Sequence, residues 1–208
     1  MIEVVNWANS HAFGDSLAAH HRLRHKCFIE RSGWDVPSHD GMEYDQFDTP
    51  AAIYLIRREA AGPVQGVVRL LPTTRPYMLQ ELWPDLLAGD VPSSPQVWEA
   101  TRFGVDDDLE PPLKRRVALE LVAGCLEFGQ AQGIERYLVL SQQMILRRTI
   151  AAAGCAIRLL GESHTLASYP VVAAEIQVNA AALASARAKT GLHGSILRQH
   201  GADAAEAA

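Results

Sequence analysis

The sequence predicts one α/β domain, in which helices flank a mixed β-sheet. Its 208 residues are the length of a single domain. Hydrophobic residues make up 48% of the chain, which is enough for a sizeable core. The expected elements run strand, helix, several strands, helix, strand, helix, strand, and this order is typical of a mixed sheet with helices on its faces. We expect the domain to span residues 1–200.

The first half of the chain predicts a strand, a long helix and a pair of strands. The opening IEVV is a short apolar strand, and Ser10 is placed to cap a helix over residues 11–30. A loop rich in Gly, Pro and Asp follows over residues 32–50. Two segments, 51–59 and 64–71, are rich in β-branched residues and are separated by a short turn, which predicts a hairpin of two strands.

The second half predicts helices that alternate with strands. A Pro-rich excursion contains one or two helical turns around residues 78–88, and a strand spans 96–105. Apolar residues at helical spacing predict a helix over 112–132, with Gly133 at its C-terminal cap. The remaining expected elements are a strand at 135–141, a helix at 142–154, strands at 155–161 and 169–178, an Ala-rich helix, and a disordered tail at 201–208.

Composition and charge exclude several classes of protein. The formal net charge of −5 argues against nucleic-acid binding, which usually requires a basic surface. No apolar run reaches the roughly 20 residues that cross a bilayer, and the N-terminus lacks the pattern of a secretion signal. The three widely spaced cysteines predict reduced thiols rather than disulfides. We therefore expect a cytoplasmic protein without membrane or nucleic-acid partners.

Common catalytic and metal-binding motifs are absent from the sequence. It contains no GxGxxG, no GxxxxGK[ST] and no HExxH, and GDSLA lacks the second glycine of a nucleophile elbow. His21 and His25 are four residues apart, as two metal ligands on a helix would be. Without a third ligand at a diagnostic spacing, we favour polar histidines on an exposed helix face and expect no metal.

Charged residues stand in otherwise apolar segments of the chain. Arg69 interrupts the strand GVVRLL, and Glu99 and Arg102 interrupt VWEATRFGV. A charge in a buried strand needs an ionic partner, because desolvation disfavours its ionised form. The loop GMEYDQFDTP supplies Asp45 and Asp48. Asp45, Asp48 and Glu99 are available as acidic partners, and we predict one connected ionic network of Arg24, Asp45, Asp48, Arg69 and Arg102. A purely architectural network is the alternative.

The same residues carry a resemblance to a known family. The runs LRHKCFIERSGWDV, GMEYDQFD, VRLLPTTRPYML and EATRFGVD resemble the acyl-homoserine lactone synthases of bacterial quorum sensing, known as autoinducer synthases. The similarity covers roughly residues 1–165. Every position of the family's pattern is filled here, by Arg24, Phe28, Trp34, Asp45, Asp48, Arg69, Glu99 and Arg102.

The resemblance implies a fold and a reaction. It implies the fold of the GNAT N-acyltransferases, a three-layer αβα sandwich whose mixed sheet contains a cleft between two splayed strands. Family members take S-adenosylmethionine and an acyl thioester of acyl carrier protein or coenzyme A, without a further cofactor, and release an acyl-homoserine lactone and methylthioadenosine. An ordinary acetyltransferase that uses acetyl-CoA and a non-catalytic binding protein of the same fold remain the alternatives.

The chemistry of this reaction suggests roles for the charged and aromatic residues. Glu99 is the candidate base for the substrate amine, and Arg102 or Arg24 can hold its carboxylate. The sulfonium favours the aromatic faces of Phe28 and Trp34 and the negative charge of Asp45 and Asp48. The remaining members of the expected site are Arg69 and Phe103. Because strand side chains alternate, Glu99 and Arg102 can share one site only if the strand bulges, which we expect near residues 100–101.

The sequence gives weaker evidence about the identity of the acyl group than about the S-adenosylmethionine site. Family members that use 3-oxoacyl chains often have a Thr where this chain has Leu138, so we expect an acyl group without a 3-oxo substituent. Coenzyme A is slightly favoured over acyl carrier protein as the carrier. Basic patches at 114–116 and 147–148 suit either anionic donor. The candidate walls of the acyl and thioester pocket are Leu121, Leu138, Leu140, Ser141, Met144 and Leu146.

Overall fold

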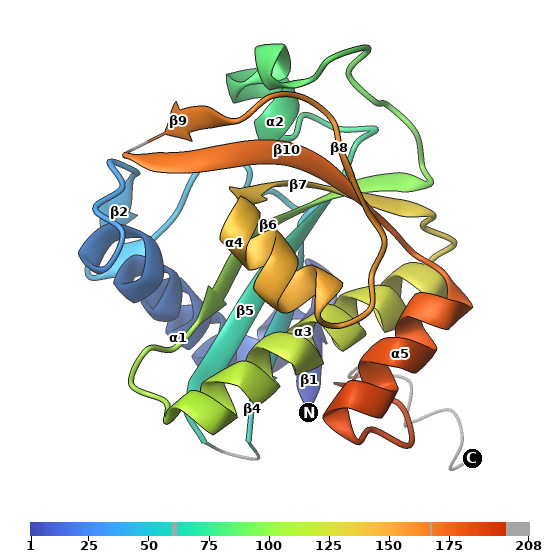
Figure 1. The fold of residues 1–208 in the computed structure, drawn as a ribbon. Coiled ribbons are helices and arrows are strands. Elements are labelled where there is room, and N and C mark those ends of the chain that lie inside the picture. Colours follow the sequence, from blue (N-terminus) through green and yellow to red (C-terminus); the bar gives the residue numbers. More distant parts are fainter. Residues whose placement is uncertain (60–61, 167, 199–208) are drawn as a thin grey trace.

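A central mixed sheet forms the middle layer of the molecule (Figure 1). The computed structural model describes residues 1–59, 62–166 and 168–198, so the predicted tail at 201–208 lies outside the described residues. The strand order is β11-β1-β4-β5-β6-β7-β10-β8, and β9 pairs with β10. The strands are β1 (Ile2–Val5), β4 (Ile53–Arg58), β5 (Val64–Pro72), β6 (Val97–Val105), β7 (Arg136–Gln142), β8 (Ile157–Leu159), β9 (His164–Leu166), β10 (Tyr169–Gln177) and β11 (Leu197–Arg198).

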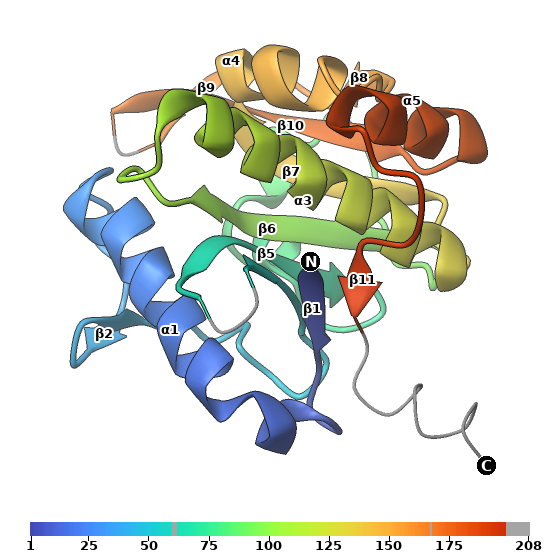
Figure 2. The same ribbon diagram turned by 90° about the horizontal axis from the view of Figure 1, so that it is seen from below.

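Helices cover both faces of this sheet, as the sequence predicts (Figure 2). Helix α1 (Gly14–Arg24) lies on one face, and α3 (Pro111–Ala131), α4 (Gln143–Ile145) and α5 (Ala180–Thr190) lie on the other. The pairs β1–β11 and β6–β7 are parallel and the other pairs are antiparallel. Among the described residues, no helix is both long enough and apolar enough to cross a membrane.

Strands β6 and β7 separate after a short pairing. Their register joins Val97, Trp98 and Glu99 of β6 to residues 136–138 of β7, and the register extends no further. Residues 100–105 therefore run free of β7 and form one side of an opening in the sheet. This confirms the cleft expected between these two strands. Helix α3 follows β6 and helix α4 follows β7, so the first turns of both helices flank the open end.

The two helices predicted at 11–30 and 142–154 are not regular α-helices. The first consists of a 3-10 turn (Ser10–Phe13), α1, and the π-helix η2 (His25–Glu30). Ser10 does not cap it, because its hydroxyl donates to the Trp7 carbonyl oxygen at 3.1 Å. The second consists of α4 and the π-helix η4 (Leu146–Ala151). A π-turn rotates the following side chains relative to an α-helix, and such turns are frequent at functional sites.

The excursion between β5 and β6 packs over the splayed region. It contains α2 (Met78–Leu82) and the 3-10 turn η3 (Pro84–Leu86), close to the expected helical turns. The Ala88 amide donates to the Leu160 carbonyl oxygen at 2.6 Å. A Cβ atom on Gly161 would lie 2.2 Å from the Leu86 carbonyl oxygen, so only glycine allows this approach. The small sheet of β2 (Ser38–His39) and β3 (Met42–Glu43), and the strands β9 and β11, were not predicted.

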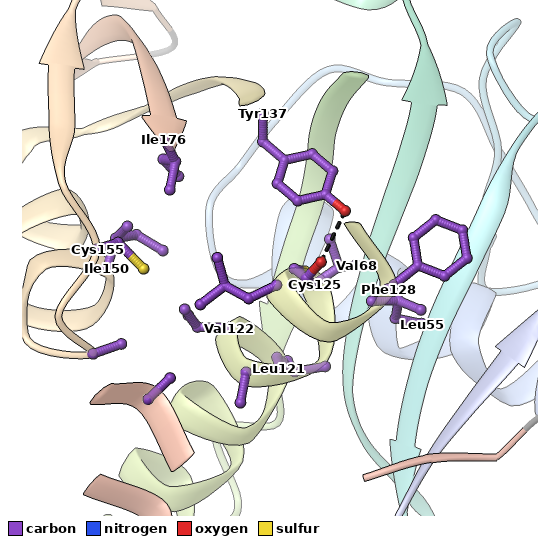
Figure 3. Packing of buried hydrophobic residues seen from close by; sticks show 14 of the residues in the cluster. Leu55, Val68, Leu121, Val122, Cys125, Phe128, Tyr137, Ile150, Cys155 and Ile176 are labelled. Carbon is purple, nitrogen blue, oxygen red and sulfur yellow. Dashed lines mark hydrogen bonds between the residues drawn. The ribbon is translucent and has the colours of Figure 1, made fainter. Parts of the chain in front are cut away.

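Two hydrophobic cores lie on opposite faces of the sheet. The first packs α3 and α5 against the sheet, and Figure 3 shows its centre, where the Tyr137 hydroxyl donates to the Cys125 carbonyl oxygen at 2.8 Å. The second lies under α1, η2 and α2, and it includes Phe28, Phe47, Met78 and Leu138. The charged residues singled out in the sequence lie on the face of the second core.

Candidate active site

A β-bulge in β6 brings the charged side chains of this strand to one face. Val67 of β5 pairs with Gly104 of β6, and Arg69 of β5 pairs with Thr101 of β6. A separation of two residues on β5 therefore matches a separation of three residues on β6. The extra residue lies at Arg102, whose φ of 54° is in the left-handed region. The predicted bulge therefore exists, one or two residues later than expected. It turns Arg102 toward the face that carries Thr101, whose hydroxyl accepts a hydrogen bond from Arg69 Nε at 3.1 Å.

Phe103, which follows Arg102 in the bulge, points the other way. Its side chain packs against the core under α3, on the opposite face from the charged residues. The structure therefore places the Phe103 side chain away from that of Arg102, and the expected contact of Phe103 with the substrate stays a prediction. The same extra residue that turns Arg102 inward turns Phe103 outward.

Three arginines and three carboxylates form a closed ring of alternating charge, which we call the charge ring. Arg24 binds Asp48 with both terminal nitrogens, at 2.7 and 2.9 Å. Asp48 also contacts Arg69 at 3.0 Å, and Arg69 binds Asp45 with two hydrogen bonds of 2.5 and 2.9 Å. Arg102 binds Asp45 at 2.6 Å and Glu43 at 2.9 Å. Glu43 also binds Arg24, at 2.5 Å, which closes the ring.

The charge ring contains all five residues of the predicted network and one further carboxylate. Arg24, Asp45, Asp48, Arg69 and Arg102 are connected as expected. The sixth member is Glu43 rather than Glu99, which forms no salt bridge with these arginines among the described contacts. The carboxylates of the loop at 41–50 are therefore close together because three buried cations lie between them.

Burial strengthens the electrostatic interactions among the six side chains of the charge ring. The side chains of Arg24, Arg69 and Glu43 are fully buried, and those of the other three members are at most 8% exposed. Burial works to raise the pKa of Asp48, but the hydrogen bonds and charge of Arg24 outweigh it and hold that pKa well below its usual range. For Asp45 the hydrogen bonds and charge of Arg69 likewise outweigh burial and lower the pKa. Asp45 and Asp48 therefore stay ionised between the buried arginines.

Glu99 lies next to the ring but makes different contacts. Its two carboxylate oxygens accept hydrogen bonds from the backbone amides of Leu79 and Met78, at 2.7 and 2.9 Å. These amides belong to the first turn of α2, so Glu99 caps that helix. Burial raises the pKa of Glu99 to about 7, against the opposing effect of the two amides. Near neutral pH this carboxyl group can therefore accept or release a proton.

An aromatic pair faces Arg102 from the segment at 25–34, which we call the aromatic arm. It comprises η2 and the following turn. Phe28 and Trp34 are stacked with their ring centroids 5.2 Å apart. The central carbon of the Arg102 guanidinium lies 5.5 Å from the Phe28 centroid and 5.8 Å from the Trp34 centroid. Aromatic faces that attract one cation here can also attract another.

Aromatic and imidazole side chains support the ring from behind. The Tyr54 hydroxyl donates to Asp48 at 2.9 Å, and His21 Nδ1 donates to the Glu43 carbonyl oxygen at 2.8 Å. His21 is only 5% exposed, so its expected place on an exposed helix face is wrong. Burial, and then the charge of Arg24, lower the pKa of His21 to about 4. Within the described residues, His, Cys, Asp and Glu form no group of three or more able to hold a metal ion.

Comparison with known proteins identifies the family. The model of a family described as autoinducer synthase matches residues 8–185. The chain belongs to the autoinducer synthase family. An acyl-homoserine-lactone synthase of Acinetobacter nosocomialis is 33% identical over 162 residues, covering 74% of this chain and 88% of that protein. An isovaleryl-homoserine lactone synthase of Bradyrhizobium diazoefficiens is 32% identical over 203 residues, covering 97% of this chain and 90% of that protein.

Solved structures agree with the family and with the fold. A CoA-dependent acyl-homoserine lactone synthase, BjaI, solved with S-adenosylmethionine and isopentyl-CoA, superposes with a TM-score of 0.89 at 32% identity, covering 97% of this chain and 93% of that one. An N-acetyltransferase from Lactobacillus plantarum has a TM-score of 0.55 at 15% identity, covering 86% and 99%, which shows a common fold. The autoinducer synthase is thus an acyltransferase with a GNAT-like fold, as predicted.

The six residues expected to form the acyl pocket of this autoinducer synthase do not form one wall. Leu138 and Leu140 belong to the second core, on the face of the charge ring, and Leu138 pairs in register with Glu99. Leu121 and Leu146 are buried in the first core, under the opposite face (Leu121 is labelled in Figure 3). Ser141 is partly buried near the end of β7, and Met144 is 53% exposed on α4.

Glu43 and the first turn of α2 are the features that sequence reasoning missed. Glu43 stands in the same loop as Asp45 and Asp48, and three arginines with two aspartates leave one cation without a partner. That imbalance could have identified Glu43. The α2 amides give no such signal, because any residue but proline has a backbone amide.

Proposed function

We propose that the charge ring and the aromatic arm bind S-adenosylmethionine, and that Glu99 accepts the proton of its amine. The aromatic faces of Phe28 and Trp34 and the carboxylates of the ring suit the cationic sulfonium and amine. Arg102, with its guanidinium against these aromatic rings, suits the carboxylate of the substrate. The observation that carries the proposal is Glu99, a fully buried carboxyl group with a pKa of about 7 that lies where β6 and β7 begin to separate.

The reaction then requires two bond-forming steps. The protonated substrate amine loses one proton to Glu99, and its nitrogen attacks the thioester carbonyl carbon. The carbon–sulfur bond then breaks, its electron pair stays on sulfur, and the thiol leaves with the second proton of the amine. The methionyl carboxylate next attacks its own Cγ, the Cγ–sulfur bond breaks, and its electron pair stays on sulfur in methylthioadenosine. Each oxygen of Glu99 accepts one backbone hydrogen bond and keeps another lone pair for the proton. A base with a pKa near the working pH is effective in such a step.

The test is turnover by the purified chain with S-adenosylmethionine and an acyl thioester. We expect methylthioadenosine and an acyl-homoserine lactone in equal amounts, detected by mass spectrometry. Glu99→Gln removes the basic group and should lower kcat about 100-fold at pH 7 with little change in the KM for S-adenosylmethionine. Glu135→Gln makes the same chemical change at an exposed glutamate and should retain activity. Full activity of Glu99→Gln at pH 7 would exclude the base role.

For the acyl donor we propose a coenzyme A thioester of a short acid without a 3-oxo group. Two similar proteins support this choice: the CoA-dependent enzyme solved with isopentyl-CoA, and the isovaleryl-homoserine lactone synthase. The acyl tail would rest on the face of the second core, against Leu138 and Leu140. The apolar side chains of α2 and of the excursion lie on the same face and would cover it.

A basic groove supports an anionic donor. A cavity of about 710 Å³ lies between α3, η4 and α5, lined by Arg115, Arg116 and Lys189 together with Pro112, Leu119, Ala152 and Thr190. The cavity lies on the face of the sheet that carries α3 and α5. The phosphates of coenzyme A or the acidic surface of acyl carrier protein would both favour this charge.

Matched acyl-CoA and acyl-carrier-protein substrates decide between the two donors. We expect at least tenfold higher kcat/KM with the coenzyme A thioester, and a reversed preference would establish acyl carrier protein as the partner. Arg115→Ala should raise the KM for the thioester and leave the KM for S-adenosylmethionine unchanged. Arg22→Ala, at an exposed arginine on α1, serves as the control.

A further inference from the structure

An acidic turn follows β6 and binds cations from two other elements. Asp106 and Asp108 contact Lys26 Nζ at 2.5 and 2.6 Å. Asp107 contacts Arg31 at 2.5 Å and also binds Lys114 of α3. Lys26 and Arg31 both belong to the aromatic arm. The turn at 106–108 thus binds the arm through a second cluster of three anions and three cations, separate from the charge ring.

Hydrogen bonds to a backbone carbonyl group also attach the arm at the same place. The Cys27 thiol and Arg31 Nη1 both approach the Val105 carbonyl oxygen, at 3.5 and 3.3 Å. Within the arm, the Trp34 amide donates to the Phe28 carbonyl oxygen at 2.9 Å, so a backbone hydrogen bond joins the two residues whose rings stack. The attachment to β6 therefore involves both ends of η2 and leaves Phe28 between them.

The ionic contacts of the turn are partly exposed to solvent. The side chains of Lys26 and Arg31 are 33% and 41% exposed, whereas the arginines of the charge ring are at most 5% exposed. Partly exposed pairs contribute little to global stability and are screened by salt. They can still affect how often the arm opens locally, alongside the buried side chains of Cys27 and Phe28.

We propose that the acidic turn Asp106–Asp108 is a positioning element that holds the aromatic arm over Arg102, and thereby sets the affinity for S-adenosylmethionine. The inference rests on the proposed binding of that substrate by Phe28 and Trp34. Arg102 lies in β6, and the acidic turn begins at Asp106, four residues later and directly after the end of this strand. A turn that holds the arm to the end of β6 fixes the gap between the aromatic rings and the Arg102 guanidinium.

Asp107→Asn in the full chain tests this role. It keeps the size of the side chain and removes the charge that binds Arg31 and Lys114. We expect backbone hydrogen exchange of residues 25–34 to accelerate about fivefold, and the KM for S-adenosylmethionine to rise by a similar factor. The values of kcat and of the KM for the thioester should stay within about twofold. Asp107→Glu should restore most of the affinity, and Asp90→Asn, in an exposed loop, should change none of these quantities.

Salt provides a second readout. At 1 M salt, where screening acts over about 3 Å, the KM of the parent should rise more than that of Asp107→Asn. Unchanged hydrogen exchange at 25–34 in the variant would overturn the attachment itself, whether or not the chain turns over S-adenosylmethionine. Faster exchange with an unchanged KM would overturn the role in substrate binding. A parent that does not consume S-adenosylmethionine would instead contradict the proposed function.

Discussion

Removing one charge from the charge ring should destabilise the protein more than most single substitutions do. Asp48 accepts hydrogen bonds from Arg24, Arg69, Tyr54 and the Asp45 amide. Asp48→Asn retains the shape but leaves three arginines with two carboxylates. The uncompensated charge then lies in a region where Arg24 and Arg69 have no exposed side-chain surface. An unpaired buried charge costs about 3–5 kcal/mol.

Equilibrium unfolding in urea at pH 7, followed by circular dichroism, measures this loss directly. For a chain of this length, 3–5 kcal/mol corresponds to a fall in Tm of about 10 °C. Asp90→Asn makes the same chemical change at an exposed site and should stay within about 0.5 kcal/mol of the parent. A loss below about 1 kcal/mol for Asp48→Asn would refute the argument that the ring is balanced charge by charge.

A double substitution separates charge balance from lost hydrogen bonds. Arg24→Met combined with Asp48→Asn removes one cation and one anion and leaves a ring of two pairs. If charge balance dominates, the double variant should be less destabilised than the sum of the single variants, by at least about 1 kcal/mol. Additive effects would indicate that the individual hydrogen bonds, not the net charge, determine the stability.

Three further predictions concern acid stability, acyl selectivity and the excursion. Because the folded pKa of His21 is about 4, the unfolded chain binds more protons between pH 6.5 and 4. His21 alone should therefore lower the stability by roughly 2 kcal/mol from pH 7 to 5, whereas Glu99, with its raised pKa, acts in the opposite direction over this range. The difference in unfolding free energy between the parent and His21→Gln isolates the His21 contribution, and a difference that does not change with pH would contradict it. Leu138→Thr adds a hydroxyl beside Glu99 and should raise the relative kcat/KM for 3-oxoacyl donors about tenfold; unchanged selectivity would exclude a contact between position 138 and the donor. Gly161→Ala forces a clash with the Leu86 carbonyl and should cost about 1–3 kcal/mol, whereas a neutral effect would contradict the close approach.

Much of the fold could be predicted from the sequence because the residue patterns that indicate helices and strands are local. β-Branched content and the short turn predicted the hairpin of β4 and β5, and helical spacing predicted α3 within one residue at each end. The cleft and the GNAT-like layers followed from the family resemblance, and the chain belongs to that family. What local signals did not distinguish was a π-helix from an α-helix. The two differ by one residue in their hydrogen-bond spacing, and both bury the same apolar side chains.

For the candidate site, the sequence determined which residues need partners, and the tertiary structure decided which partners they have. Arginines in apolar strands must be neutralised wherever they lie, so a network with Asp45 and Asp48 could be predicted from burial and charge alone. Whether Glu43 or Glu99 completes it depends on which carboxylate the folded chain brings to Arg102. The bulge, the loop and α2 together place Glu43 there and leave Glu99 on the amides of α2. Charge is a property of a residue, whereas the distance between residues far apart in the chain is set only when the whole sheet has formed.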